Sequence, residues 1–185
     1  AVNYTAFEAA ESAKETIHVL QMNLMPDMTK DAATYVNFAD TTTVTGAKFA
    51  AYLSAVADFN VEIAFMENSD WYRAYGENGS YAKSNHATKE EMVERFKAYL
   101  DDVDMLIIGY CDVAAFTSDE VFYEAFMDFV NQGKSVILSH DLVHDDAIST
   151  EYTDKVSQYD AVIRTLAGQR RTREGVAVEN EYMDN

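Results

Sequence analysis

The sequence predicts an α/β domain with a three-layer, doubly wound, mostly parallel sheet. Two short apolar runs, Met105–Tyr110 and Ser135–Ser139, each end in a cluster of polar residues. Between them lies an amphipathic segment, Ser118–Asn131, which Gly133 closes. Unbroken apolar runs are typical of parallel strands buried on both faces, and a parallel pair needs a crossover connection. These segments therefore predict a strand, a crossover helix that Ser118 caps, and a second strand.

The amino-terminal half shows the same alternation of strand and helix. Ile17–Met22 and Val61–Met66 are predicted strands, because β-branched and apolar residues dominate both segments. Thr45–Phe59 lies between them and carries apolar residues at helical spacing, which predicts an amphipathic helix. Its predicted core face consists of Phe49, Tyr52, Leu53, Val56 and Phe59.

Two long connections leave the carboxyl ends of these first two strands. Asn23–Val44 has no clear period, and we expect it to be partly helical around Lys30–Phe38. Glu67–Ala87 is rich in aromatic and polar residues, and we interpret it as a loop. Connections of this length in a compact domain usually have a function or are mobile.

Two further helices complete the predicted domain. Thr88 followed by Glu91 is a capping-box signal that starts one of them before the central strand. Its predicted apolar stripe is Met92, Val93, Phe96, Tyr99 and Leu100. The other is predicted from about Thr150 to Ala167. We therefore expect a single domain over residues 1–168, followed by a tail or edge strand over residues 169–185.

Right-handed crossovers arrange the four predicted strands in the order 2-1-3-4, with helices on both faces. The switch point then lies between the first and third strands, and ligands of such sheets bind beyond the carboxyl ends of the strands. The rim at that point would hold Gln21, Asn23, Cys111 and Asp112. A pocket there is the expected site.

The composition excludes several classes of partner. The net charge of −18, from 14 Lys and Arg against 32 Asp and Glu, repels the phosphates of nucleic acids and anionic lipids. No stretch has the ~18 consecutive apolar residues of a membrane span, so membrane insertion is not expected. No glycine-rich phosphate fingerprint follows any predicted strand, and no cofactor is predicted.

The segments 104–112, Asp-Met-Leu-Ile-Ile-Gly-Tyr-Cys-Asp, and 129–141, Phe-Val-Asn-Gln-Gly-Lys-Ser-Val-Ile-Leu-Ser-His-Asp, support a family resemblance. Together with the helix between them, they resemble the core of class I glutamine amidotransferase-like domains, which have flavodoxin-like topology. The resemblance covers about residues 15–168 and is closer to an uncharacterised branch found in large bacterial surface proteins. It alone favours an extracellular or cell-surface location.

Catalytic members of that class carry a Gly-x-Cys-x-Gly elbow after the strand that matches Val136–Ser139. This chain has Leu-Ser-His-Asp-Leu over residues 138–142, without the cysteine or either glycine. No His-x-Glu pair follows, since the last histidine is His144. The resemblance therefore implies a non-catalytic module that serves in binding or structure within a larger, exported bacterial protein.

Two catalytic alternatives remain open. In the first, the chain is a hydrolase whose nucleophile is Cys111, with His140 as its base and Asp112 or Asp141 orienting the imidazole. Acidic surroundings oppose this hypothesis, because they raise the pKa of a thiol. In the second, a metal ion is held by His140 and Asp141 together with His144 or Asp112, since imidazole and carboxylate are ligands for zinc and manganese.

A ligand-binding role is also considered for Gln21, Asn23 and Tyr110 at the expected rim, and for Trp71. Trp and Tyr rings between residues 71 and 81 offer flat amphipathic faces for a sugar or a peptide. Aromatic side chains in such segments more often pack on their own domain. Carbohydrate, peptide or a neighbouring domain of the parent protein are the partners considered.

Overall fold

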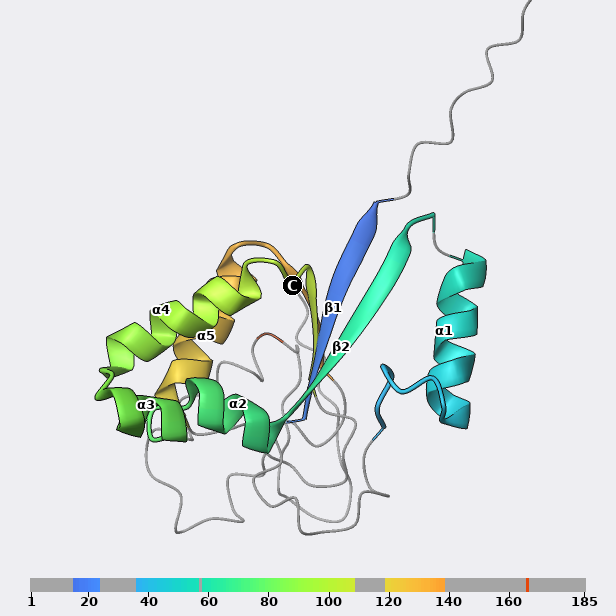
Figure 1. The fold of residues 1–185 in the computed structure, drawn as a ribbon. Helices are drawn as coiled ribbons and strands as arrows, with labels where there is room; N and C mark the ends of the chain where they lie inside the picture. Colours follow the sequence, from blue (N-terminus) through green and yellow to red (C-terminus); the bar gives the residue numbers. More distant parts are fainter. Residues whose placement is uncertain (1–14, 24–35, 57, 109–118, 139–165, 167–185) are drawn as a thin grey trace, which may run out of the picture.

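The computed structural model of this chain describes residues 15–23, 36–56, 58–108, 119–138 and 166. Within these residues, four parallel strands form one sheet in the order β2-β1-β3-β4 (Figure 1). The strands are β1 (Thr16–Asn23), β2 (Asn60–Glu67), β3 (Met105–Ile108) and β4 (Ser135–Leu138). The predicted α/β fold and the strand order 2-1-3-4 are confirmed.

Helices lie on both sides of this sheet (Figure 1). One side is occupied by α1 (Val44–Val56), which lies beside β2. The other side is covered by α2 (Asn68–Tyr75), α3 (Ser80–Asn85), α4 (Lys89–Leu100) and α5 (Glu120–Asn131). The chain passes from β1 to β2 in one direction along the sheet, and from β2 to β3 and β4 in the opposite direction. Right-handed crossovers therefore place α1 on one face and the later helices on the other.

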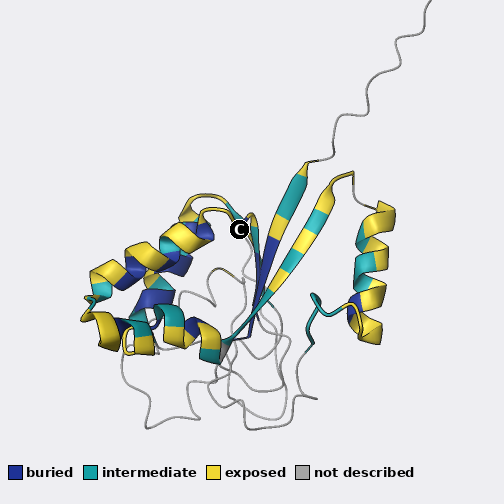
Figure 2. Cartoon of the chain, viewed as in Figure 1, coloured by how far each residue is buried: buried dark blue, intermediate teal, exposed yellow. Residues whose placement is uncertain are grey.

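The hydrophobic core lies between the sheet and the pair α4 and α5, where buried residues concentrate (Figure 2). Alternate strand residues point toward these helices because successive side chains of a strand face opposite sides. The strands contribute Leu20, Met22, Leu106 and Ile108, and the helices contribute Met92, Val93, Phe96, Leu100, Val121, Phe122, Phe126 and Phe129. The predicted apolar stripe of α4 is therefore confirmed, except that Tyr99 is partly exposed.

The caps of α4 and α5 show how the sequence starts these helices. The predicted capping box of α4 is present, with reciprocal hydrogen bonds between Thr88 and Glu91. The N-cap of α5 is Asp119, whose Oδ1 accepts a hydrogen bond from the backbone N–H of Val121 at 2.9 Å. The prediction of Ser118 as this cap was wrong by one residue, because both residue types can cap and only the helix start distinguishes them.

Glu67–Ala87 is the main correction to the predicted elements. The segment holds two short helices, α2 and α3, instead of a loop. The first is amphipathic, and Trp71 lies on its core side. At the end of the first connection, residues 36–38 are not helical, and its earlier part lies outside the described residues. The predicted helix Thr150–Ala167 and the tail also lie outside them, apart from the exposed residue Leu166.

Candidate functional site

Gln21 lies near the carboxyl end of β1, where the sequence predicts a ligand site. Its side chain is buried, with 1% exposed. Its Nε2 donates a hydrogen bond to the carbonyl oxygen of Val36, and its Oε1 accepts one from the backbone N–H of Phe38 at 2.8 Å. The amide therefore fastens residues 36–38 to the sheet, and both ends of the amide already have partners within the chain.

Asn23 ends the same strand and is also interior. It is 2% exposed and takes part in an interaction within the chain. Burial of a polar side chain costs free energy unless its hydrogen-bonding groups have partners. A buried polar residue at this position therefore stabilises the fold through bonds within the chain. The two described residues of the predicted rim are thus buried side chains and not an open ligand surface.

The remaining candidates lie outside the described residues, and their predicted roles stay predictions. They are Tyr110, Cys111, Asp112, His140, Asp141 and His144. In the part of the chain that the structure describes, no group of three or more His, Cys, Asp or Glu side chains is arranged to hold a metal ion.

Trp71 occupies the core instead of the surface. Its ring lies edge-on to Phe96, with ring centroids 5.9 Å apart, and edge-on to Phe122 at 5.5 Å. The side chain is fully buried, and its indole Nε1 has no hydrogen-bond partner among the described residues. A ligand that stacks on the face of this ring has no access to it, so the predicted ligand contact through Trp71 does not fit this position.

The nearby tyrosines pack on their own domain as well. The guanidinium carbon of Arg95 lies 3.8 Å from the ring centre of Tyr81 and 5.4 Å from that of Tyr75. Burial raises the pKa of Tyr75. Two rings that share one guanidinium form a cation–π cluster, which holds α3 and the end of α2 against α4.

A groove lies on the opposite side of the sheet, between α1 and β2. Its volume is about 630 Å³. The lining residues come from the segment before α1, from α1 itself, and from the first half of β2 with the residue before it. They are Phe38, Ala39, Thr41, Ala50, Leu53, Ser54, Phe59, Asn60, Val61, Glu62 and Ile63. The sequence did not predict this groove, because it lies away from the carboxyl ends of the strands.

The groove exists because α1 covers the sheet only partly. The predicted core face of α1 is wrong in part: Tyr52 is 61% exposed and Val56 is 58% exposed. Phe49, from the same predicted face, packs against Phe38 of the segment before α1, with ring centroids 4.4 Å apart. Figure 2 shows α1 as mostly exposed or intermediate, in contrast to α4 and α5. Part of the apolar face of α1 is therefore exposed in the described part of the chain.

Comparison with protein-family models, with curated proteins and with solved structures finds no match to this chain. Any functional conclusion therefore depends on the residues and their geometry.

The alternation of polar and apolar residues in the first half of Asn60–Glu67 separates the two faces of β2. Val61 and Ile63 line the groove, whereas Glu62 is in register with His18 and contacts it on the other face. The distance between α1 and β2, which opens the groove, has no signal in the local sequence. Across the described ranges, no helix has both the length and the apolar character needed to cross a membrane.

Proposed function

We propose that this chain is a non-catalytic module, built on an amidotransferase-like α/β sheet, that acts by binding within a larger, exported bacterial protein. The observation that carries the proposal is the use of Gln21, whose buried amide is bonded to the backbone of residues 36–38 at the carboxyl end of β1. Both the nitrogen and the oxygen of this amide are hydrogen-bonded within the fold, so we do not expect the side chain to orient a substrate.

The residues after β4 support the same conclusion. A nucleophile elbow places its side chain on a sharp, strained turn, and glycines on both sides permit that turn. Residues 138–142 are Leu-Ser-His-Asp-Leu and contain neither glycine nor cysteine. The chain has one cysteine, Cys111, at the end of a different predicted strand. A hydrolase based on Cys111 and His140 is the alternative that an experiment must separate from the proposal.

The reaction rate of Cys111 with a thiol-reactive disulfide probe separates the two functions. We expect the folded protein at pH 7 to react no faster than glutathione, because an activated cysteine needs a neighbouring base to form thiolate. The variant His140→Ala should react at the same rate as the wild type. His86→Asn is the matched control, since His86 is exposed and has a left-handed backbone conformation that Asn tolerates.

Rapid labelling that His140→Ala abolishes and His86→Asn retains would overturn the proposal in favour of the hydrolase. Stoichiometric zinc or manganese that persists after dialysis of the folded protein would overturn it in favour of a metal site. Slow labelling in all three proteins, with no retained metal, supports the binding module.

A further inference from the structure

We infer that Asn78 is a site of spontaneous deamidation, and that the turn between α2 and α3 sets its rate by withholding the backbone nitrogen that attacks the side-chain amide. Asn78 precedes Gly79, and this is the single Asn-Gly step in the sequence. The inference goes beyond the proposed function and does not depend on it.

The reaction at an Asn-Gly step is intramolecular. The backbone nitrogen of the glycine attacks Cγ of the asparagine, so that a C–N bond forms while the bond from Cγ to Nδ2 breaks. Nδ2 leaves as ammonia with the proton that the backbone nitrogen gives up. Water then opens the succinimide ring, at Cγ to give aspartate or at the backbone carbonyl carbon to give isoaspartate. A glycine favours ring closure, because it has no Cβ to crowd the attacking nitrogen.

The side chain of Asn78 is available for this reaction, whereas the attacking nitrogen is engaged. Asn78 is exposed between α2 and α3 (Figure 1). The N–H of Gly79 donates a hydrogen bond to the carbonyl oxygen of Gly76 at 3.0 Å, which closes a β-turn over residues 76–79. Succinimide formation removes the proton of that same N–H. The hydrogen bond of the turn must therefore break before Asn78 reacts.

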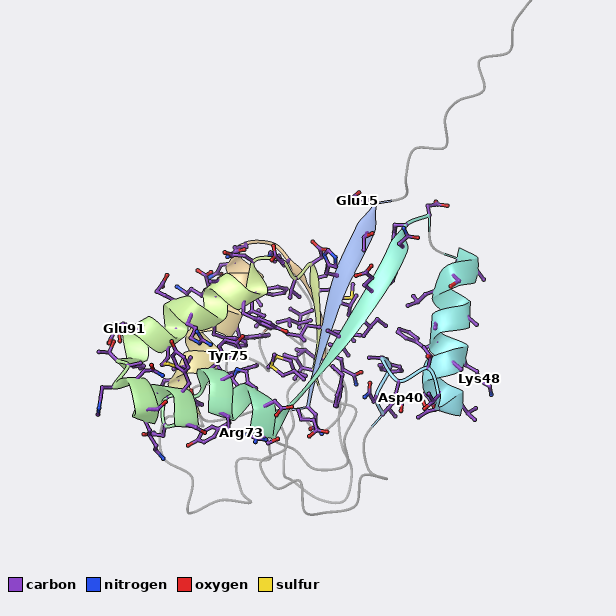
Figure 3. All side chains as sticks on the ribbon, viewed as in Figure 1. Glu15, Asp40, Lys48, Arg73, Tyr75 and Glu91 are labelled. Atoms are coloured by element: carbon purple, nitrogen blue, oxygen red, sulfur yellow. The ribbon has the colours of Figure 1, made fainter. Side chains whose placement is uncertain are left out.

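Contacts on both sides hold the turn closed. On the amino-terminal side, Tyr75 ends α2 and packs on Phe96 of α4, with ring centroids 5.0 Å apart (Figure 3). On the carboxyl-terminal side, the carbonyl oxygen of Gly79 accepts a hydrogen bond from the N–H of Lys83 at 3.1 Å. The backbone of Gly79 also lies so close to the carbonyl oxygen of Tyr72 that a Cβ atom has no room there.

A further contact comes from a distant part of the chain. Oδ2 of Asp119 accepts a hydrogen bond from the backbone N–H of Glu77 at 3.1 Å, inside the same turn. Asp119 is the N-cap of α5, which packs against α4 in the core. Hydrogen bonds to an ionised carboxylate are stronger than those between neutral groups, so its loss should open the turn several-fold more often.

The products differ from the turn that precedes them. Both add a carboxylate next to Glu77, in a chain whose net charge is already −18. Isoaspartate also inserts one carbon into the main chain directly before Gly79, which is held on both sides. The closed turn does not fit this longer chain, so a modified molecule does not return to the original turn.

The rate at Asn78 is measured by peptide mapping with mass spectrometry, in the folded protein and in guanidinium chloride at the same mildly alkaline pH. We expect conversion in the unfolded protein, and conversion at least about tenfold slower in the folded protein, because the reaction waits for the turn to open. Absence of conversion in the unfolded protein, or equal rates in the two states, would overturn the inference.

Hydrogen exchange of the Gly79 amide measures the same opening independently. Exchange and ring closure both need the free N–H, and ring closure also needs the side chain of Asn78 to reach it. The factor by which the fold slows deamidation should therefore be at least as large as the protection factor of this amide. A smaller factor would show that the reaction does not need the turn to open, which overturns the role of the turn.

Two variants separate opening of the turn from unfolding of the whole chain. Asp119→Ala removes the acceptor for Glu77, and we expect it to react at least about threefold faster than the wild type. Gly133→Ala weakens the fold at the other end of α5, where φ is 78°, and should react at the wild-type rate. Equal acceleration in both variants would show that global unfolding limits the reaction, which overturns the role of the turn. An unchanged rate in Asp119→Ala would contradict the part assigned to Asp119.

Discussion

Asp119 connects two parts of the chain that the sequence separates by more than forty residues. Its Oδ2 accepts a hydrogen bond from the backbone N–H of Glu77 at 3.1 Å, and its Oδ1 accepts one from Val121. Burial raises the pKa of Asp119, and the backbone donors of Glu77, Val121 and Phe122 offset this rise only in part. The folded state therefore holds a proton on this carboxyl more tightly than the unfolded state does.

The pH dependence of stability follows from that direction. Because the folded pKa exceeds the unfolded value of about 3.9, the contribution of Asp119 is most favourable below that value and is lost as the pH rises through the folded pKa. Asp119→Asn keeps the acceptor and removes the charge. We expect it to be as stable as the wild type or more stable at pH 7, with this advantage shrinking on acidification, as measured by urea unfolding.

Asp119→Ala is the control for the hydrogen bonds. It should lose about 1 kcal/mol below the unfolded pKa, because the cap of α5 and the link to Glu77 disappear together, and this loss should shrink as the pH rises, because the variant has no charge to bury. If Asp119→Asn instead becomes less stable than the wild type as the pH rises, burial does not dominate the pKa of this group.

At the scale of elements, the turn between α2 and α3 depends on a close approach at Gly79. A Cβ atom at this position would lie 1.9 Å from the carbonyl oxygen of Tyr72. Gly79→Ala must therefore shift the backbone of one helix, and we expect a loss of about 2 kcal/mol in urea unfolding. Trp71 is the single tryptophan and lies in α2, so its emission should shift to longer wavelength if α2 moves off the core.

Gly133→Ala distinguishes steric conflict from backbone strain. Gly133 has φ of 78°, and nothing lies within 4 Å of the Cβ position. The substitution should cost about 1–2 kcal/mol through the left-handed backbone alone and leave the Trp71 emission of the folded protein unchanged. Unchanged Trp71 emission in Gly79→Ala as well would show that the turn absorbs the added atom without moving α2.

Strands and long helices were predictable from the sequence, whereas short helices and the groove were not. The parallel strands β3 and β4 are apolar runs, and α4 and α5 repeat apolar residues over three turns, so pattern and structure agree. The helices α2 and α3 are too short for such a period. The groove depends on how far α1 stands from β2, which no local pattern specifies.

At the scale of the whole molecule, acidic side chains far outnumber cations. Lys89 contacts Glu120 at 3.1 Å and Glu124 at 2.7 Å, which links α4 to α5. Lys97 lies 3.2 Å from Glu94 on its own helix and 3.7 Å from Asp128 of α5. Pairs this near the surface stabilise the fold only weakly, because solvent screens them. With 14 Lys and Arg against 32 Asp and Glu, the chain still carries a net charge of −18.

Salt should therefore stabilise the fold. The Debye length falls from about 30 Å at 0.01 M to about 10 Å at 0.1 M, so added salt weakens repulsion over the whole surface more than it weakens contacts of 3–4 Å. Relief of about 1 kcal/mol would raise Tm by about 2–4 °C in a chain of this size. Calorimetry in sodium chloride and in choline chloride should give the same rise, because screening does not depend on the identity of the cation. A fall in Tm would mean that the ion pairs between α4 and α5 outweigh the repulsion, and a rise with sodium alone would indicate a specific cation site.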